Sequence, residues 1–466
     1  MKVTAKALAL VAATAILGGC RISYKEAVVA RNDIMFGSGD VAFERASNMA
    51  RSTVNRTLGN FELARIKMLR GDFAGSSAVF GPCLDELFDE ADTGPVLKKG
   101  AVAGNILAGT LGDDRAIPYE LPAFELLLGL QYQAVNSLAL GNRDNARVYL
   151  KRATAVQEQL KEENGREPDA NSPEADAQAA ANAQNASNAS GQIVAKLSPV
   201  ADAVRASYEN ALAWYLMGFF LSKENDPSNA AIAYNEAGRI CPAITPLTAA
   251  PNGGGQDILV VYEENLVDIR EPIKIPLPFG GTIWSVDFPV YNAPPYPPSS
   301  IVLEAGGAMA AQCVPVVNVQ ALAYRDLKDR VPGIAMRNVT RAAVKIAAQQ
   351  VANHINTGNS VGNLALRLGV LAYNATSTAI SEADTRCWQT VPEYVQLARF
   401  ALPADAASIT VRNARTGQSG EIAIPPGGGT KIVWITDVRG YANVSVLPVD
   451  TRIDPTWSRI RSLLYP

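Results

Sequence analysis

The residues with the most definite chemistry form the tetrad Leu17-Gly18-Gly19-Cys20, which resembles a bacterial lipobox, a pattern whose cysteine becomes a lipidated N-terminus. Two lysines, Lys2 and Lys6, open the chain, and the almost wholly apolar run behind them is too short to span a bilayer permanently. This order of basic, apolar and small residues is typical of a secretory signal. We therefore expect a signal peptide over residues 1–19 and a mature chain whose first residue, Cys20, carries lipid.

Length and charge narrow the classes of partner. The 466 residues suffice for two or three domains and a sizeable core. Loss of the signal peptide would remove two of the 42 basic residues and none of the 45 acidic ones, so the mature chain is acidic and is not expected to bind nucleic acid. Arg21 follows Cys20, and the absence of aspartate there favours the outer membrane in enterobacterial lipoproteins. We expect an outer-membrane protein that is lipid-anchored and faces the periplasm.

The remaining cysteines and the single histidine argue against a metal centre. Cys83, Cys241, Cys313 and Cys387 each stand alone in an apolar or helical stretch, where cysteine packs as a small hydrophobe. No Cys-x-x-Cys pair occurs, and His354 is the only histidine. The periplasm permits disulfides, so the pairing of these cysteines stays open. We expect no metal and no other cofactor.

Two glycine-rich segments imitate catalytic motifs. Residues 358–362 satisfy G-x-S-x-G, the pattern of a serine nucleophile, but a helix is expected before that serine and His354 lies upstream of it. Residues 425–431 resemble a phosphate-binding loop but lack its spacing and precede a strand. Both segments are expected to be turns or loops, and we expect no enzymatic activity.

The N-terminal half repeats a helical pattern. One segment has small and aromatic residues at the consensus positions of a tetratricopeptide repeat, namely Trp214, Met217, Gly218, Ala230, Tyr234, Ala237 and Pro242. Gly71 and Gly141 mark the turns of two weaker copies, although an irregular helical bundle could match the same pattern. We expect a tetratricopeptide-like domain over residues 20–242, with a disordered insert at 164–192, where large apolar residues are scarce.

The C-terminal half mixes strand and helix signals. Helices are expected from Pro332 to about Asn356 and over residues 364–382. Apolar runs and alternation predict strands at 257–262, 271–278, 283–288, 300–303 and 314–319, and further strands between 395 and 447. The predicted fold class is therefore α+β: an N-terminal all-α repeat domain, a mixed region over 243–394 with two long helices, and a small β-unit with a C-terminal tail over 395–466.

The first of these long helices has a row of cations. Arg337, Arg341 and Lys345 are spaced four residues apart, so they share one helical face. Such a face could bind an anion, for example a lipid phosphate or a peptidoglycan carboxylate. The alternative is a solvated or salt-bridged surface.

Five features occur together in this chain: the lipobox, the repeats, the strand at 271–278, the cationic helix and the segment Ala383-Asp384-Thr385-Arg386-Cys387-Trp388. Together they resemble a poorly characterised family of bacterial lipoproteins. Members of that family are often encoded beside small outer-membrane lipoproteins that activate penicillin-binding proteins, so the resemblance implies a role in envelope assembly. In its most recognisable segment, Asp384, Arg386 and Trp388 are expected to form a buried ion pair and an aromatic anchor that fix the preceding helix to the terminal β-unit.

These features lead to the hypothesis of a lipid-anchored periplasmic scaffold or adaptor that holds a protein partner during envelope or cell-wall assembly. The partner groove is expected on the concave helical surface, at Trp214, Met217 and Tyr234. One alternative is a peptidoglycan- or glycan-binding regulator or enzyme with its site in the C-terminal half. Another is a structural subunit of an outer-membrane machine.

Overall fold

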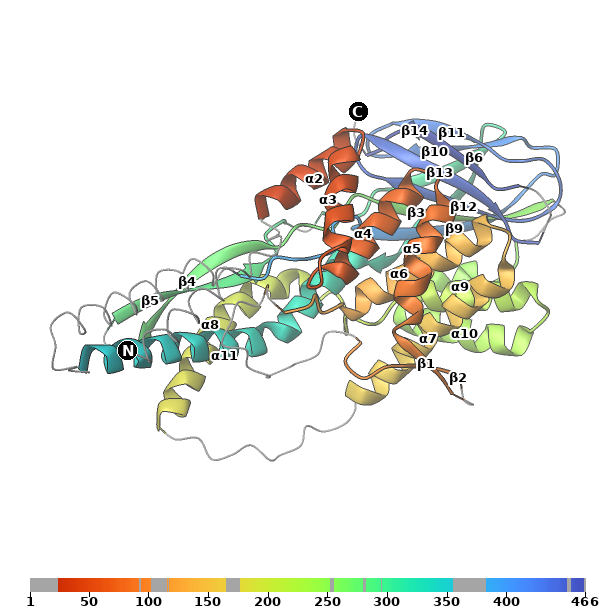
Figure 1. Cartoon of the computed structure of the whole chain (residues 1–466). Helices are drawn as coiled ribbons and strands as arrows, with labels where there is room; N and C mark the ends of the chain where they lie inside the picture. The colour runs from red at the N-terminus through yellow and green to blue at the C-terminus, as the bar shows by residue number, and fades with distance from the viewer. Residues whose placement is uncertain are drawn as a thin grey trace.

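Helices come first along the chain and sheets follow, which gives a mixed α+β fold (Figure 1). The computed structural model describes residues 24–91, 94–101, 115, 117–164, 177–251, 255–279, 282–294, 296–354, 383–450 and 454–464. None of the helices within these ranges has the length and apolar character needed to cross a membrane.

The N-terminal half consists mainly of helices. They are α2 (Tyr24–Phe36), α3 (Asp40–Ala50), α4 (Arg56–Leu69), α5 (Phe73–Asp85), α6 (Ala123–Ala139), α7 (Arg143–Asn164), α8 (Ala177–Ala201), α9 (Ala211–Lys223), α10 (Pro227–Ile240) and the 3-10 helix η2 (Pro242–Leu247). A small hairpin of β1 (Phe88–Ala91) and β2 (Gly94–Leu97) follows α5. Helices α4–α5, α6–α7 and α9–α10 pack as three helical hairpins.

These three helical hairpins share one turn design, built on the dipeptides Gly71-Asp72, Gly141-Asn142 and Asn225-Asp226. The first residue of each dipeptide has a left-handed backbone, which glycine and asparagine tolerate best. The second residue donates its backbone N–H to a carbonyl in the last turn of the first helix. Its side chain then accepts the N–H three residues ahead, at 2.8, 3.0 and 3.2 Å respectively, and so caps the second helix.

The C-terminal half contributes the strands. They are β3 (Gln256–Glu264), β4 (Glu271–Phe279), β5 (Thr282–Val290), β6 (Ile301–Ala305), β7 (Ala308–Gln312), β8 (Val314–Asn318), β9 (Tyr394–Leu402), β10 (Ser408–Asn413), β11 (Ser419–Ala423), β12 (Gly429–Asp437), β13 (Tyr441–Pro448) and β14 (Thr456–Arg461). One sheet has the order β14-β13-β12-β3-β9-β8 and another has the order β11-β10-β6-β7. The strands predicted as a separate unit over 395–466 therefore share both sheets with β3, β6 and β8, so a boundary at 394/395 would cut through them.

The six-stranded sheet is the middle layer of the body. From β3, Leu259 and Val261 face the helices, whereas Ile258 and Val260 face the four-stranded sheet. Because both faces of β3 are covered, its sequence is an uninterrupted apolar run rather than an alternating one. The body thus has three layers: helices, the six-stranded sheet and the four-stranded sheet.

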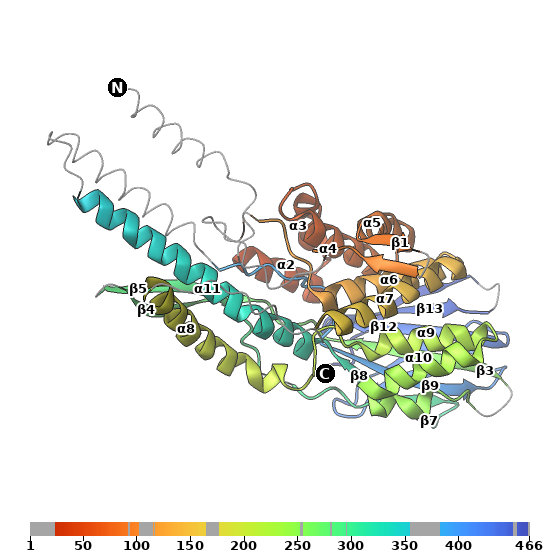
Figure 2. The same ribbon diagram turned by 90° about the horizontal axis from the view of Figure 1, so that it is seen from below.

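A second part, here called the arm, consists of α8, the β4–β5 hairpin and the long helix α11 (Val319–His354). It projects away from the layered body (Figure 2). The buried face of α8 carries mainly small or branched residues, namely Ala186, Ala189, Ile193, Leu197 and Val200. Their small size lets α8 lie close along α11, which is its main contact.

Two predictions about elements of the arm are wrong. Helix α11 starts at Val319, because the Asn318 side chain accepts the Ala321 N–H at 2.9 Å and caps it, so Pro332 lies inside the helix instead of opening it. Residues 177–192, predicted to be disordered, belong to α8. Their many alanines favour helix strongly even though they supply few large apolar side chains. The rest of the predicted insert at 165–176 and the predicted helix at 364–382 lie outside the described residues.

Candidate functional site

Helix α9, which carries the predicted groove residues Trp214 and Met217, is covered together with α6 by the protein's own six-stranded sheet. Every residue of α6 is buried. Tyr132 of α6 donates its hydroxyl to Glu263 of β3 at 2.8 Å, and Lys223 of α9 pairs with Asp257 of β3 at 2.6 Å. The inner face of α6 and α9 is therefore covered by β3 and its neighbours, and the part of the chain that the structure describes has no open partner groove on that face.

A buried ion pair ties the first helical hairpin to the same strand. Arg65 of α4 and Glu263 form a salt bridge in which each side chain is 1% exposed. The Arg65 guanidinium also lies 3.9 Å from the ring centroid of Tyr132 and donates to the Thr436 hydroxyl at 3.2 Å. Removing either member of the pair would leave an uncompensated buried charge, so this contact holds the helical layer against the sheet.

The three residues predicted for the groove lie in different surroundings. The Tyr234 ring packs on Gly218, where an added Cβ would sit 2.7 Å from the ring, and lies 5.4 Å from the Tyr215 ring centroid. Met217 packs against the main core. Trp214, by contrast, borders a surface hollow. Gly218 and Tyr234 therefore serve the packing of α9 on α10. The repeat pattern at these positions indicates a contact between two helices rather than a binding surface.

The hollow lies on the outer side of the helical layer, between α7 and α10, and has a volume of about 140 Å³. Trp214 is only 6% exposed, whereas Ile232 is 60% exposed. The full lining comprises Gln157, Glu158, Lys161, Tyr208, Glu209, Trp214, Ile232, Glu236 and Arg239. The site thus combines two aromatic residues, one exposed aliphatic side chain and a charged border.

Carboxylates dominate the charge of this hollow. Arg239 binds two of them, Glu236 at 2.8 Å and Glu209 at 3.1 Å. Glu158 lies across from Glu236, and burial, followed by repulsion from Glu236 and Glu162, raises its pKa. A positive group entering the hollow would therefore be favoured by Glu158.

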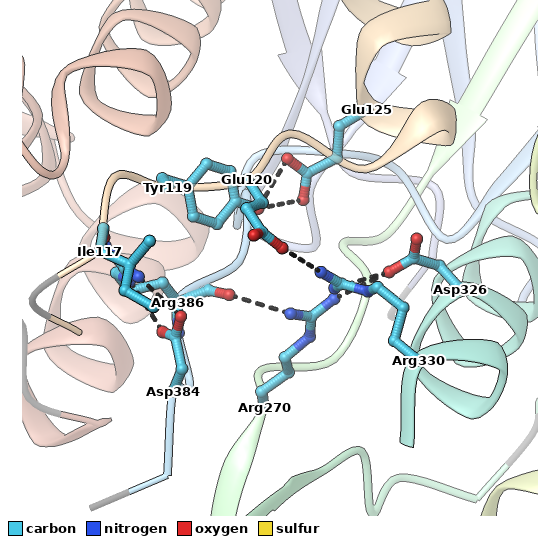
Figure 3. Close-up of polar contacts among 9 residues, drawn as sticks. All are labelled: Ile117, Tyr119, Glu120, Glu125, Arg270, Asp326, Arg330, Asp384 and Arg386. Atoms are coloured by element: carbon cyan, nitrogen blue, oxygen red, sulfur yellow. Dashed lines mark hydrogen bonds and ion pairs between the residues drawn. The ribbon is translucent and has the colours of Figure 1, made fainter. Parts of the chain in front are cut away.

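The residues with the family-like pattern lie in a segment that we call the strap, residues 383–393, directly before β9. Arg386 is buried and pairs with Asp384 at 2.7 Å (Figure 3). Its Nη1 also donates to the Val54 carbonyl, the Asn55 side chain and the Ile117 carbonyl at 3.0 to 3.2 Å. Burial would raise the pKa of Asp384, but the Arg386 charge and its hydrogen bonds hold that pKa below its usual range.

Trp388 is the aromatic anchor of the strap, and it enters the helical layer. Its ring meets those of Phe61, Phe80 and Tyr132 edge-on, at centroid distances of 5.0, 6.0 and 5.8 Å. These rings belong to α4, α5 and α6. The anchor was expected to fix a helix to the terminal β-unit. It instead fixes the entry of β9 to the N-terminal helices.

Two buried glutamates hold the strap backbone. Glu125 accepts the Trp388 N–H at 3.1 Å. It also accepts the Tyr119 hydroxyl at 2.8 Å (Figure 3). Glu62 accepts the Gln389 N–H at 2.7 Å and the Thr390 hydroxyl at 2.9 Å. Burial raises the pKa of Glu125 to about 7. Sequence reasoning missed both residues, although Glu125 is the one acid in an otherwise apolar helical run, which is the available signal.

A further polar cluster lies at the root of the arm. Asp326 of α11 binds Arg330 at 2.8 Å and Arg270, which precedes β4, at 3.4 Å (Figure 3). Arg270 also donates to the Arg386 carbonyl at 3.2 Å, while Arg330 reaches Glu120 near the start of α6. The cluster therefore links the arm, the strap and the helical layer.

Arg341, the middle residue of the cationic row on α11, does not lie on an open face. Arg341 is only 6% exposed, and its guanidinium donates to the Asn338 side chain at 3.2 Å. Asn338 in turn donates to the Asp287 carbonyl on β5 at 3.0 Å. Arg337 is half-buried, and the Lys345 side chain lies outside the described residues. Arg341 is therefore part of the contact between α11 and the β4–β5 hairpin.

The four cysteines are unpaired, two of them half-buried (Cys83, Cys241) and two buried (Cys313, Cys387). Burial raises the pKa of the Cys83 and Cys387 thiols to about 11, so both are neutral near pH 7. Within the described part of the chain, no three His, Cys, Asp or Glu side chains are grouped so that they could hold a metal ion.

The predicted acylation site, Cys20, lies outside the described residues, as do residues 358–362. Comparison with known proteins does not identify a family or a function for this chain. No protein-family model, curated protein or solved structure matches this sequence.

Proposed function

We propose that the protein is a non-enzymatic scaffold of the bacterial envelope, held at the outer membrane by lipid on Cys20, that binds a protein partner through the hollow between α7 and α10. The resemblance noted for the sequence suggests a partner in cell-wall assembly. The observation that carries the proposal is the hollow itself, because Trp214 and the exposed Ile232 give it an apolar interior inside a charged border.

The size of the hollow favours a protein partner over a small-molecule substrate. Its volume of about 140 Å³ is well below the roughly 300–1,000 Å³ of most small-molecule pockets. It is suited to one side chain, and protein interfaces commonly depend on one anchor residue that fills such a pocket.

The charge of the hollow favours a lysine or arginine as that anchor. The aliphatic stem would lie along Trp214 and Ile232, and the cationic head would meet Glu158. Binding of the cation would offset the repulsion between Glu158 and Glu236, which otherwise raises the pKa of Glu158.

We also propose that the three helical hairpins are degenerate tetratricopeptide repeats. Their shared turn design supports this, since one turn recurs with the same cap and the same left-handed residue. Tetratricopeptide stacks present a groove on their inner helices. Here β3 and its neighbours occupy that groove, so partner binding is proposed for the outer side.

The test is crosslinking and capture of the lipidated full-length protein from detergent-solubilised envelopes, with an Ile232→Lys variant. Ile232 is 60% exposed, so the substitution should leave the fold intact while placing a cation beside Glu158 and Glu236, where it repels a cationic anchor. A Val148→Lys variant is the matched control, since Val148 lies on α7, is 42% exposed and does not line the hollow.

We expect one defined envelope protein to be captured by the wild type and by Val148→Lys, and to be lost with Ile232→Lys. Equal capture by all three chains would refute the hollow as the binding site. Recovery of glycan or peptidoglycan fragments in place of a protein would favour the alternative function in the C-terminal half.

A further inference from the structure

The outer face of α2 exposes large apolar side chains to solvent. Val29 is 56% exposed and Phe36 is 66% exposed. They are seven residues apart and therefore lie on the same helical face, together with Lys25 and Asn32. Val41, just beyond the turn into α3, is 50% exposed. Single exposed apolar residues are ordinary, but two on one helical face with a third just beyond the turn call for an explanation.

Helix α2 cannot rotate to bury this face. Its other side already packs into the body through Ala27, Ala30, Ile34 and Met35. The Arg31 guanidinium donates to the Leu266 carbonyl at 2.6 Å, and the Tyr441 hydroxyl donates to the Ile34 carbonyl at 2.8 Å. These contacts fix the orientation of α2, so the exposed face has a defined direction relative to the whole body.

The predicted lipid anchor brings this face near a membrane. Only three residues lie between Cys20 and Tyr24, the first residue of α2. The four steps from Cys20 to Tyr24 span at most about 14 Å when the chain is fully extended. If Cys20 is acylated, as the proposed function requires, the start of α2 lies within that distance of the lipid surface.

We propose that the outer face of α2, with Val29 and Phe36, and the neighbouring Val41 form a membrane-contact surface that lies in the headgroup region of the phospholipid bilayer. Interfacial helices place their apolar face about 5–10 Å into this region. The contact would fix the orientation of the anchored body, where the lipid alone would leave it free to turn.

The test uses the lipidated full-length protein in vesicles of phosphatidylethanolamine and phosphatidylglycerol whose acyl chains are brominated near the headgroup. A Phe36→Trp variant reports contact with lipid, because bromine quenches tryptophan only at short range. A Val148→Trp variant is the control, since Val148 is 42% exposed on α7. The five native tryptophans are common to all the chains, so each signal is compared with that of the wild type.

We expect the added emission of Phe36→Trp to be quenched and shifted to the blue, and that of Val148→Trp to be unaffected. Equal quenching at the two positions, or none at either, would overturn the membrane-contact surface. Flotation of the same vesicles tests the anchor separately. A chain that floats without quenching at position 36 refutes this inference alone, whereas a chain that fails to float refutes the lipid anchor and the inference with it.

Discussion

Replacing Glu125 by glutamine should remove much of the pH dependence of stability that the strap imposes. Glu125 is fully buried, and its pKa rises from the usual 4.5 to about 7. In the folded protein the carboxyl therefore keeps its proton up to near neutral pH, whereas in the unfolded chain it loses that proton near pH 4.5. The stability that the neutral form contributes is complete below the unfolded value and is lost as the pH rises toward 7.

The size of the effect follows from that interval. Each pH unit between the two pKa values costs about 1.4 kcal/mol, and pH 5 to pH 7 lies between them, so the folded state loses about 2.5 kcal/mol between pH 5 and pH 7.5 through this group. For a chain of 466 residues, the entropy of unfolding is about 1 kcal/mol per degree, so the loss corresponds to a Tm decrease of about 2.5 °C.

The assay is thermal unfolding of the wild type and Glu125→Gln at pH 5 and pH 7.5. Glutamine has the shape of a protonated glutamate, so it should accept the Trp388 N–H and donate to the Tyr119 hydroxyl oxygen without gaining a charge. The two chains should be equally stable at pH 5, and the variant should be the more stable at pH 7.5. Glu264→Gln is a second instance, because burial raises the pKa of Glu264 to about 7 as well. Parallel pH profiles for the wild type and Glu125→Gln would refute the reasoning.

Three further predictions concern the contacts between layers. Trp388→Ala should lower the free energy of unfolding by about 4 kcal/mol, because it removes a buried ring packed edge-on against three others; a loss below 1 kcal/mol in urea unfolding would contradict this. Arg65→Met should lower the free energy of unfolding by about 3–5 kcal/mol, because it leaves Glu263 buried without its cation. Adding Glu263→Gln should restore part of that loss, and additive losses in the double-mutant cycle would argue against coupling of the two residues. Asn142→Ala should lower the free energy of unfolding by about 1 kcal/mol, because it removes the cap of α7, and the urea midpoint should fall accordingly. Asn32→Ala, on the exposed face of α2, is the control and should leave the midpoint unchanged.

The sequence predicted local elements better than it predicted their partners. Strands β3 to β6, β8 and the strands from β9 to β13 coincide with predicted apolar runs or alternation, but β1, β2, β7 and β14 were missed. Strand β7 consists mainly of small residues (Ala308–Gln312), and β14 is mostly exposed. Neither has the apolar alternation that marks a strand. Nothing local in Val260 specifies that it pairs with Ala398 on one side and Val433 on the other, so the sheet order could not be read from the chain.

For the candidate sites too, contacts between residues close in sequence were predictable, whereas contacts made by the tertiary fold were not. Asp384 and Arg386 are two residues apart, so their pairing was accessible from the sequence, whereas the contacts of Arg386 with Val54 and Ile117 depend on the tertiary fold. Trp214 and Tyr234 were assigned to one groove because they share a repeat pattern. That pattern encodes how α9 packs on α10, and it carries no information about which face the rest of the chain covers.

The central position of β3 has a consequence for how the protein is made. Synthesis delivers the chain from its N-terminus, so the N-terminal helices and β3 emerge long before β9 and β12, the strands on either side of β3. Until β9 and β12 are made, the inner surfaces of α6 and α9 and both edges of β3 have no partners. A long stretch of chain separates β3 from each of these two strands, and closing such long loops makes assembly slow. The newly made protein therefore passes through a stage in which apolar surfaces of its core are exposed, and such surfaces favour aggregation until the last strands arrive.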